Sequence, residues 1–69
     1  MSNIKWRPTQ DGKGYWALAE GFRLVVKEQD DYLWWYGVYE DDVIVAEGET
    51  DYEEDAKTMA ENLVYDGGS

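Results

Sequence analysis

Carboxylates are the side chains of this sequence that could do chemistry, and one stretch concentrates them. The run YEDDVIVAEGETDYEED, residues 39–55, contains nine acidic residues and no basic residue. Paired carboxylates can act as general acid and base, but a glycosidase needs two that face each other across a cleft. A chain of 69 residues without histidine or cysteine offers little cleft, no usual general base and no thiolate nucleophile. We therefore expect no catalytic residue, no cofactor and no enzymatic activity.

Calcium binding is the other chemistry that clustered carboxylates could provide. The segment DYEEDA places side-chain oxygens at several positions from Asp51 onward, but an EF-hand loop requires glycine at its sixth position and glutamate at its twelfth. Those positions are occupied by Ala56 and Asn62. The absence of histidine and cysteine also removes the commonest ligands of transition metals. We expect no metal site.

The net charge of −10 lies entirely in the second half of the chain. Residues 1–35 carry five bases and five acids, whereas residues 36–69 carry eleven acids and one base, Lys57. Nucleic acids and anionic membranes both select positive charge and are poor partners for such a chain. The aromatic run LWWYGVY could stack bases, but stacking platforms lie in positive grooves. We expect a basic, nucleic-acid-binding protein as the partner, with no direct nucleic acid and no membrane.

The apolar pattern predicts an α+β fold, a three- or four-stranded antiparallel β-meander with one C-terminal α-helix packed on one face. Alternating and β-branched residues predict strands within 15–49, joined by tight turns at Glu20–Gly21 and Asp41–Asp42. From Thr50 the period becomes helical, with a capping-box pattern at Thr50–Glu53. We expect one small domain, composed of an N-terminal segment and loop over 1–14, the sheet over 15–49 and the helix over 50–66.

One helix can cover only one face of this sheet. Alternation assigns to the helix side Phe22, Leu24, Val26, Trp34, Tyr36, Val38, Ile44 and Ala46. The opposite face, which we call the open face, then carries Val25, Trp35, Tyr39, Val43 and Val45. A patch of this kind approaches the limit for a monomer. Three structures could cover this face: the N-terminal segment, folding across it with Trp6 and Pro8; a second copy of the chain in a homodimer; or a different partner protein.

Local roles explain only part of the acidic stretch. Carboxylates in the first turn of a helix gain from the helix dipole, and Asp41–Asp42 are ordinary turn residues. However, a net charge of about 2 to 8 suffices for the solubility of a small domain. A halophilic surface would be acidic throughout, whereas the first half of this chain is neutral. The excess therefore indicates a binding surface.

Carboxylates one helical turn apart are about 5 Å from each other, a scale comparable with the phosphates of a DNA strand. We therefore expect a phosphate-like array that a DNA- or RNA-binding protein meets as a decoy. The predicted partner-binding carboxylates are Asp41, Asp42, Glu47, Glu49, Asp51, Glu54, Asp55 and Glu61. Trp35 and Tyr39 are the predicted aromatic anchors of an interface.

The run WWYGVYEDDVIVAEGETDYEEDAKTMAENL resembles the strand–turn–strand–helix end of small proteins from phages and mobile elements. In size and acidity the chain is similar to phage-encoded nucleic-acid mimics, the class that includes many anti-CRISPR and anti-restriction proteins. This resemblance implies a DNA mimic that inhibits a host defence nuclease such as a CRISPR–Cas complex.

The alternative is a homodimeric structural or assembly module that uses the aromatic sheet face. The N-terminal residues MSNIKWRPTQ lack the apolar core of a signal peptide, and no apolar run approaches the length of a membrane span. The expected location is the cytoplasm, or the host cytoplasm for a phage protein.

Overall fold

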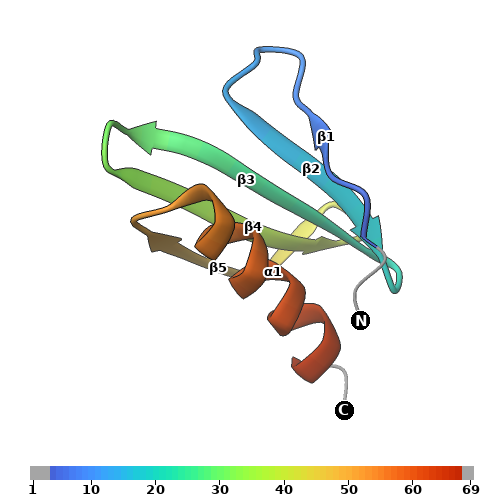
Figure 1. Cartoon of the computed structure of the whole chain (residues 1–69). Coiled ribbons are helices and arrows are strands. Elements are labelled where there is room, and N and C mark those ends of the chain that lie inside the picture. The colour runs from blue at the N-terminus through green and yellow to red at the C-terminus, as the bar shows by residue number, and fades with distance from the viewer. Residues whose placement is uncertain (1–3, 68–69) are drawn as a thin grey trace.

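The computed structural model describes residues 4–67, with side chains described as far as Tyr65. It contains one antiparallel sheet whose five strands lie in chain order, followed by one helix. The strands are β1 (Arg7–Pro8), β2 (Gly14–Ala19), β3 (Phe22–Asp30), β4 (Leu33–Glu40) and β5 (Val43–Thr50), and the helix is α1 (Glu53–Gly67). The helix crosses one face of the sheet (Figure 1). The predicted α+β class, with an antiparallel sheet and a C-terminal helix, is confirmed.

The strand count exceeds the prediction of three or four because of β1. This strand has only two residues, and it pairs Arg7 with Trp16 and Pro8 with Tyr15 at the edge of the sheet. A two-residue strand containing proline has no alternation that a sequence pattern could detect. Its effect is to place the N-terminal segment beside β2.

Two tight turns set the register of the sheet. The backbone angle φ is positive at Glu20 (54°) and Gly21 (82°), and again at Asp41 (52°) and Asp42 (66°). Two successive residues with positive φ are typical of the type I′ turn, whose twist matches that of the flanking strands. Aspartate tolerates this left-handed conformation better than most residues other than glycine. Both predicted turns are confirmed, and Asp41 and Asp42 therefore have a structural role.

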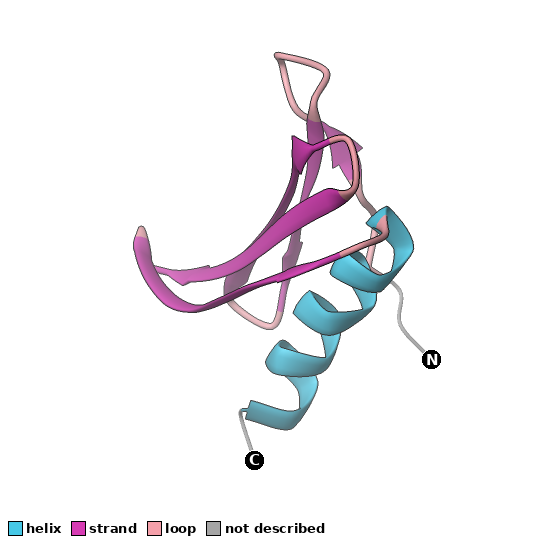
Figure 2. Cartoon of the chain, turned by 90° about the vertical axis from the view of Figure 1, so that its left-hand side faces the viewer, coloured by secondary structure: helices cyan, strands magenta, loops and turns pink. Residues whose placement is uncertain are grey.

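An irregularity in the β4–β5 ladder changes which side chains share a face. Val38 pairs with Ala46, but Tyr39 pairs with Ile44, so that Val45 has no partner in the ladder. Paired residues of an antiparallel ladder lie on the same face. Ile44 therefore lies on the open face with Tyr39, and the prediction that it faces the helix is wrong. A β-bulge of this kind also bends a hairpin, and the tip of β4–β5 extends away from the helix in Figure 2.

The same register shift moves Val43. It pairs with Glu40, the neighbour of Tyr39, and thus lies on the face opposite to Tyr39. The prediction that Val43 lies on the open face is therefore also wrong. Val43 is 61% exposed because it lies at the hairpin tip, beyond the cover of the helix.

The core lies between the sheet and the helix. Its buried side chains are Ala17, Leu24, Val26, Tyr36, Val38, Ala56, Ala60 and Val64. Leu24 and Val26 are fully buried, and each contributes about 1.5–3 kcal/mol through the removal of its apolar surface from water. The ring of Tyr36 covers Gly48, where any Cβ atom would collide with it.

The helix begins later and buries a narrower stripe than the sequence predicts. Thr50 ends β5 instead of capping the helix, which begins at Glu53. Of the apolar side chains that recur at helical spacing, Ala56, Ala60 and Val64 are buried, whereas Met59 and Leu63 remain 45% and 37% exposed. The buried positions recur every four residues, so the stripe is one side chain wide. Within residues 4–67, no helix has the length and apolar character needed to cross a membrane.

The N-terminal segment packs on the helix side of the sheet. Trp6 is half-buried against the core, and its indole N–H donates a hydrogen bond of 2.9 Å to Glu61. Pro8 pairs with Tyr15, so it lies on the same face. The possibility that Trp6 and Pro8 fold across the open face is therefore wrong. Within the described chain, no helix or strand covers that face.

Candidate protein-binding surface

Three elements end or begin at the same side of the molecule, and each brings carboxylates with it. β3 ends at Asp30, β5 ends at Thr50, and α1 begins at Glu53. The start of β4 lies between them, since Leu33 pairs with Asp30 and Trp34 pairs with Thr50. This side of the molecule is on the left in Figure 1. Carboxylates that are distant in the sequence are therefore gathered together by the strand register.

We call this cluster the acidic end. Its exposed carboxylates are Asp30, Asp31, Glu49, Asp51, Glu54 and Asp55. Among the described residues, none of these six has a cationic side chain within 4.0 Å. Like charges at one end of a small domain repel each other, which disfavours the isolated fold. A cationic partner would relieve that repulsion.

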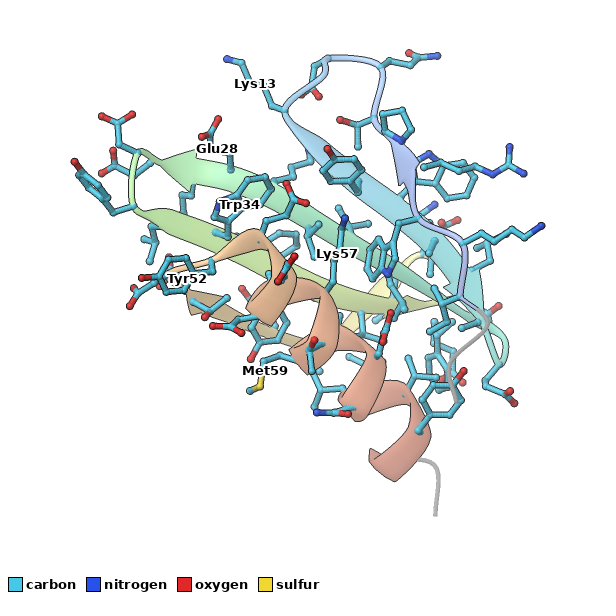
Figure 3. The ribbon with its side chains drawn as sticks, viewed as in Figure 1. Lys13, Glu28, Trp34, Tyr52, Lys57 and Met59 are labelled. Atoms are coloured by element: carbon cyan, nitrogen blue, oxygen red, sulfur yellow. The ribbon has the colours of Figure 1, made fainter. Side chains whose placement is uncertain are left out.

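Two tyrosines project from the acidic end. Tyr32 in the β3–β4 turn is 84% exposed, and Tyr52 before the helix is 68% exposed. Figure 3 shows Tyr52 on the same side of the molecule as Trp34 and Glu28, away from the helix C-terminus. Neither tyrosine belongs to the core. Aromatic rings in exposed positions are enriched among the residues that anchor protein interfaces.

The structure brings together half of the predicted partner-binding carboxylates. Glu49, Asp51, Glu54 and Asp55 belong to the acidic end. Asp41 and Asp42 lie at the opposite end of the sheet, in the β4–β5 turn. Asp30 and Asp31 are not among the predicted residues, because their place beside the others depends on the pairing of β3 with β4 and of β4 with β5.

Of the four predicted carboxylates outside the acidic end, three make contacts within the chain. Asp42 lies 3.3 Å from the guanidinium of Arg23. Glu47 accepts a hydrogen bond of 3.3 Å from the indole of Trp35. Glu61 accepts the hydrogen bond from Trp6 and is half-buried.

Glu61, although predicted to act with Asp51, Glu54 and Asp55 in one phosphate-like array, does not lie with them. Asp51 precedes the helix, and Glu61 faces the N-terminal segment. The helix directs Glu61 toward the sheet because it lies four residues after Lys57 and eight after Glu53, which are also half-buried.

The single base in the second half of the chain has internal partners. The Lys57 Nζ atom is 3.1 Å from Glu53 and 4.0 Å from the ring centroid of Tyr15, and it also faces Trp6 at 5.8 Å. Figure 3 shows Lys57 directed from the helix toward the sheet. Its charge therefore stabilises the packing of the helix against β2 and the N-terminal segment, and it does not neutralise the acidic end.

The predicted aromatic anchors lie on the open face and also make internal contacts. The indole of Trp35 lies over Gly37, where a Cβ atom would collide with it. The guanidinium of Arg23 lies 5.0 Å from the ring centroid of Tyr39. Both aromatic side chains are half-buried. Arg23 and Lys27 share the open face with Val25, as the alternation along β3 predicts, so this face is not purely apolar.

The pKa of the Asp11 carboxyl group is lowered by its surroundings. Hydrogen bonds from the Thr9 hydroxyl and from the Lys13 backbone amide, the latter at 3.0 Å, lower the pKa of Asp11. Asp11 belongs to the β1–β2 loop and stabilises its turn. Over the described residues, no three carboxylates are placed to hold a metal ion together.

Comparisons with known proteins found no matching family model, no matching curated protein and no matching solved structure. The functional proposals therefore rest on the geometry of this chain.

Proposed function

We propose that this chain is a non-catalytic binding protein whose acidic end occupies a basic, nucleic-acid-binding surface of a partner protein. The observation that carries the proposal is the combination of six exposed carboxylates without nearby cations and two exposed tyrosines at the same end. Either feature alone has an ordinary explanation in solubility or loop composition. Together they supply the charge and the anchors of an interface.

A surface that binds phosphates is the natural complement of the acidic end. Such surfaces carry arginine and lysine, and binding releases the counterions held around the opposing charges. Carboxylates at the end of β5 and the start of α1 would take the places of phosphates. Tyr32 and Tyr52 would stack on arginine or aromatic side chains of the partner, as bases do.

The narrower form of the proposal is a phage inhibitor of a host defence nuclease, such as a CRISPR–Cas complex, acting in the host cytoplasm. The small size and the net charge of −10 support it. A decoy needs no chemistry of its own, since it blocks the nuclease by occupying the path of the nucleic acid.

A capture experiment with two matched charge variants tests this function. The immobilised protein is incubated with host lysate at low and at high salt, and bound proteins are identified by mass spectrometry. We expect a nucleic-acid-binding protein that high salt or added duplex DNA releases. Asp51→Lys with Asp55→Lys should abolish capture, whereas Glu20→Lys with Glu40→Lys, the same charge change at the opposite end, should retain it.

Two results would contradict the proposal. Capture of no nucleic-acid-binding protein at low salt would reduce the acidic end to a solubility feature. Equal loss of capture in the two double variants would mean that net charge, and not the acidic end, determines binding.

The uncovered open face favours a second candidate, a homodimeric structural or assembly module. Trp35, Tyr39 and Val25 are half-exposed there, and no described element covers them. Sedimentation equilibrium tests this alternative. It predicts a dimer that Trp35→Ala converts into a monomer, and a monomeric parent protein at all concentrations excludes it.

A further inference from the structure

Basic side chains cluster on the open face although the protein as a whole is strongly acidic. Two adjoining hollows lie on either side of Trp16. Lys5 and Arg7 line one of them, with a volume of about 330 Å³, and Arg23 and Lys27 line the other, with a volume of about 470 Å³. Four of the six bases of the chain thus surround one indole ring.

The larger hollow has an apolar floor with a cation toward each end. Val25 forms the floor, and it pairs on one side with Trp16 and on the other with Gly37, over which the indole of Trp35 lies. Arg23 and Lys27 lie two residues before and after Val25 on β3, about 13 Å apart along the strand. Two aromatic rings, those of Trp16 and Tyr39, line this hollow together with Thr9.

The two cations differ in how they are held. Arg23 is fixed between the ring of Tyr39 at 5.0 Å and the carboxylate of Asp42 at 3.3 Å. Lys27 has no carboxylate within 4.0 Å among the described residues, although its charge helps to lower the pKa of Asp11. A ligand anion would therefore meet one free ammonium group and one guanidinium that Asp42 partly neutralises.

We propose that this hollow binds a nucleoside monophosphate, with the base stacked on Trp16 or Tyr39 and the phosphate paired with Lys27 or Arg23. A volume of about 470 Å³ falls in the usual range for a small-molecule site. Aromatic walls select a planar ring, and the two cations select an anion. This site lies outside the acidic end, so the proposal is independent of the function proposed above.

A small anion fits this face better than a nucleic acid strand does. Glu47 and Glu49 continue the same face beyond β4, since they pair with Gly37 and Trp35. A polyanion crossing the sheet would meet these carboxylates and the field of ten excess negative charges. A single phosphate at Lys27 lies two strands away from Glu47 and Glu49, about 10 Å, where ions at physiological salt screen most of their charge.

Chemical-shift mapping with adenosine monophosphate, adenosine and inorganic phosphate tests the site. Saturable shifts are expected at the Trp16 indole and at the amides of Val25 and Tyr39, and adenosine or phosphate alone should bind about tenfold more weakly. Lys27→Gln should weaken binding of the monophosphate about tenfold. Lys13→Gln removes the same charge from a side chain outside the hollow and should leave binding unchanged.

A second pair of variants tests for an increase in affinity for the monophosphate. Asp42→Asn frees Arg23 and should strengthen binding about threefold, whereas Asp41→Asn makes the same change of charge at the neighbouring turn residue and should have a smaller effect. The site is excluded if adenosine, guanosine, cytidine and uridine monophosphates all fail to give saturable shifts at about 10 mM. It is also excluded if phosphate alone binds as tightly, or if Lys13→Gln weakens binding as much as Lys27→Gln.

Discussion

Leu24 and Val25 are neighbours in β3, and they lie in opposite environments. Leu24 faces the helix and is fully buried, whereas Val25 lies on the floor of the open face and is half-buried. The same contrast holds for two lysines. Lys57 is enclosed by Glu53, Tyr15 and Trp6 on the helix side, and Lys27 projects from the open face. Similar residue types therefore stabilise the fold on one face and remain available for binding on the other.

Truncation of one apolar side chain on each face should give the largest difference in the free energy of unfolding. Leu24→Ala should lower the free energy of unfolding by about 2–5 kcal/mol, because it leaves a cavity between the sheet and the helix. Val25→Ala should cost less than about 1 kcal/mol, because its side chain already contacts water. Urea unfolding of the two variants measures both values. Comparable losses would mean that the open face is covered in solution.

Replacement of one lysine on each face by alanine should give a smaller difference in stability. Lys57→Ala should destabilise the protein by about 1–2 kcal/mol through the loss of its ring contacts and of its ion pair with Glu53. Lys27→Ala should change stability by no more than about 0.5 kcal/mol. Thermal unfolding of the parent and the two variants distinguishes them. An equally stable Lys57→Ala variant would show that this lysine does not fasten the helix.

Substitutions in the β4–β5 turn should have the smallest effect on stability, and they should increase it. Asp41→Asn combined with Asp42→Gly creates the pair that type I′ turns favour, at positions where φ is 52° and 66°. The relief of backbone strain exceeds the loss of the exposed Arg23–Asp42 ion pair, so stability should rise by about 0.5–1 kcal/mol. A higher urea midpoint with an unchanged slope would record this gain. A lower midpoint would show that the ion pair outweighs the strain.

Alternation of side chains predicts most of the sheet but not its finer geometry. The turns at Glu20–Gly21 and Asp41–Asp42 follow from local turn chemistry, and the faces of β3 follow from a period of two. The bulge that leaves Val45 unpaired has no local signal, so simple alternation predicts the wrong faces for Ile44 and Val43. The capping pattern predicts a helix that begins at Thr50, three residues before its actual start at Glu53, because Thr50 is the last residue of β5.

The candidate surfaces depend on contacts between distant residues, which composition cannot supply. The run of acids in residues 39–55 is evident in the sequence, but Asp30 joins it only through the pairing of β3 with β4. Glu61 lies apart from the acidic end because it accepts a hydrogen bond from Trp6, which is 55 residues away in the chain. The composition of the first half is neutral and does not predict the cluster of bases around Trp16. Only the strand register places Arg7 and Lys27 on one face.

Chemical-shift mapping with a short arginine-rich peptide tests the central claim, that the acidic end is the surface for a basic partner. The peptide supplies the charge of such a partner and no other specificity. We expect shifts concentrated at Asp30–Tyr32 and Glu49–Asp55, with the ring signals of Tyr32 and Tyr52 among the largest. Equal shifts at the opposite end of the sheet, at Glu20 and Glu40–Asp42, would contradict the claim, because they would mean that the peptide follows net charge alone.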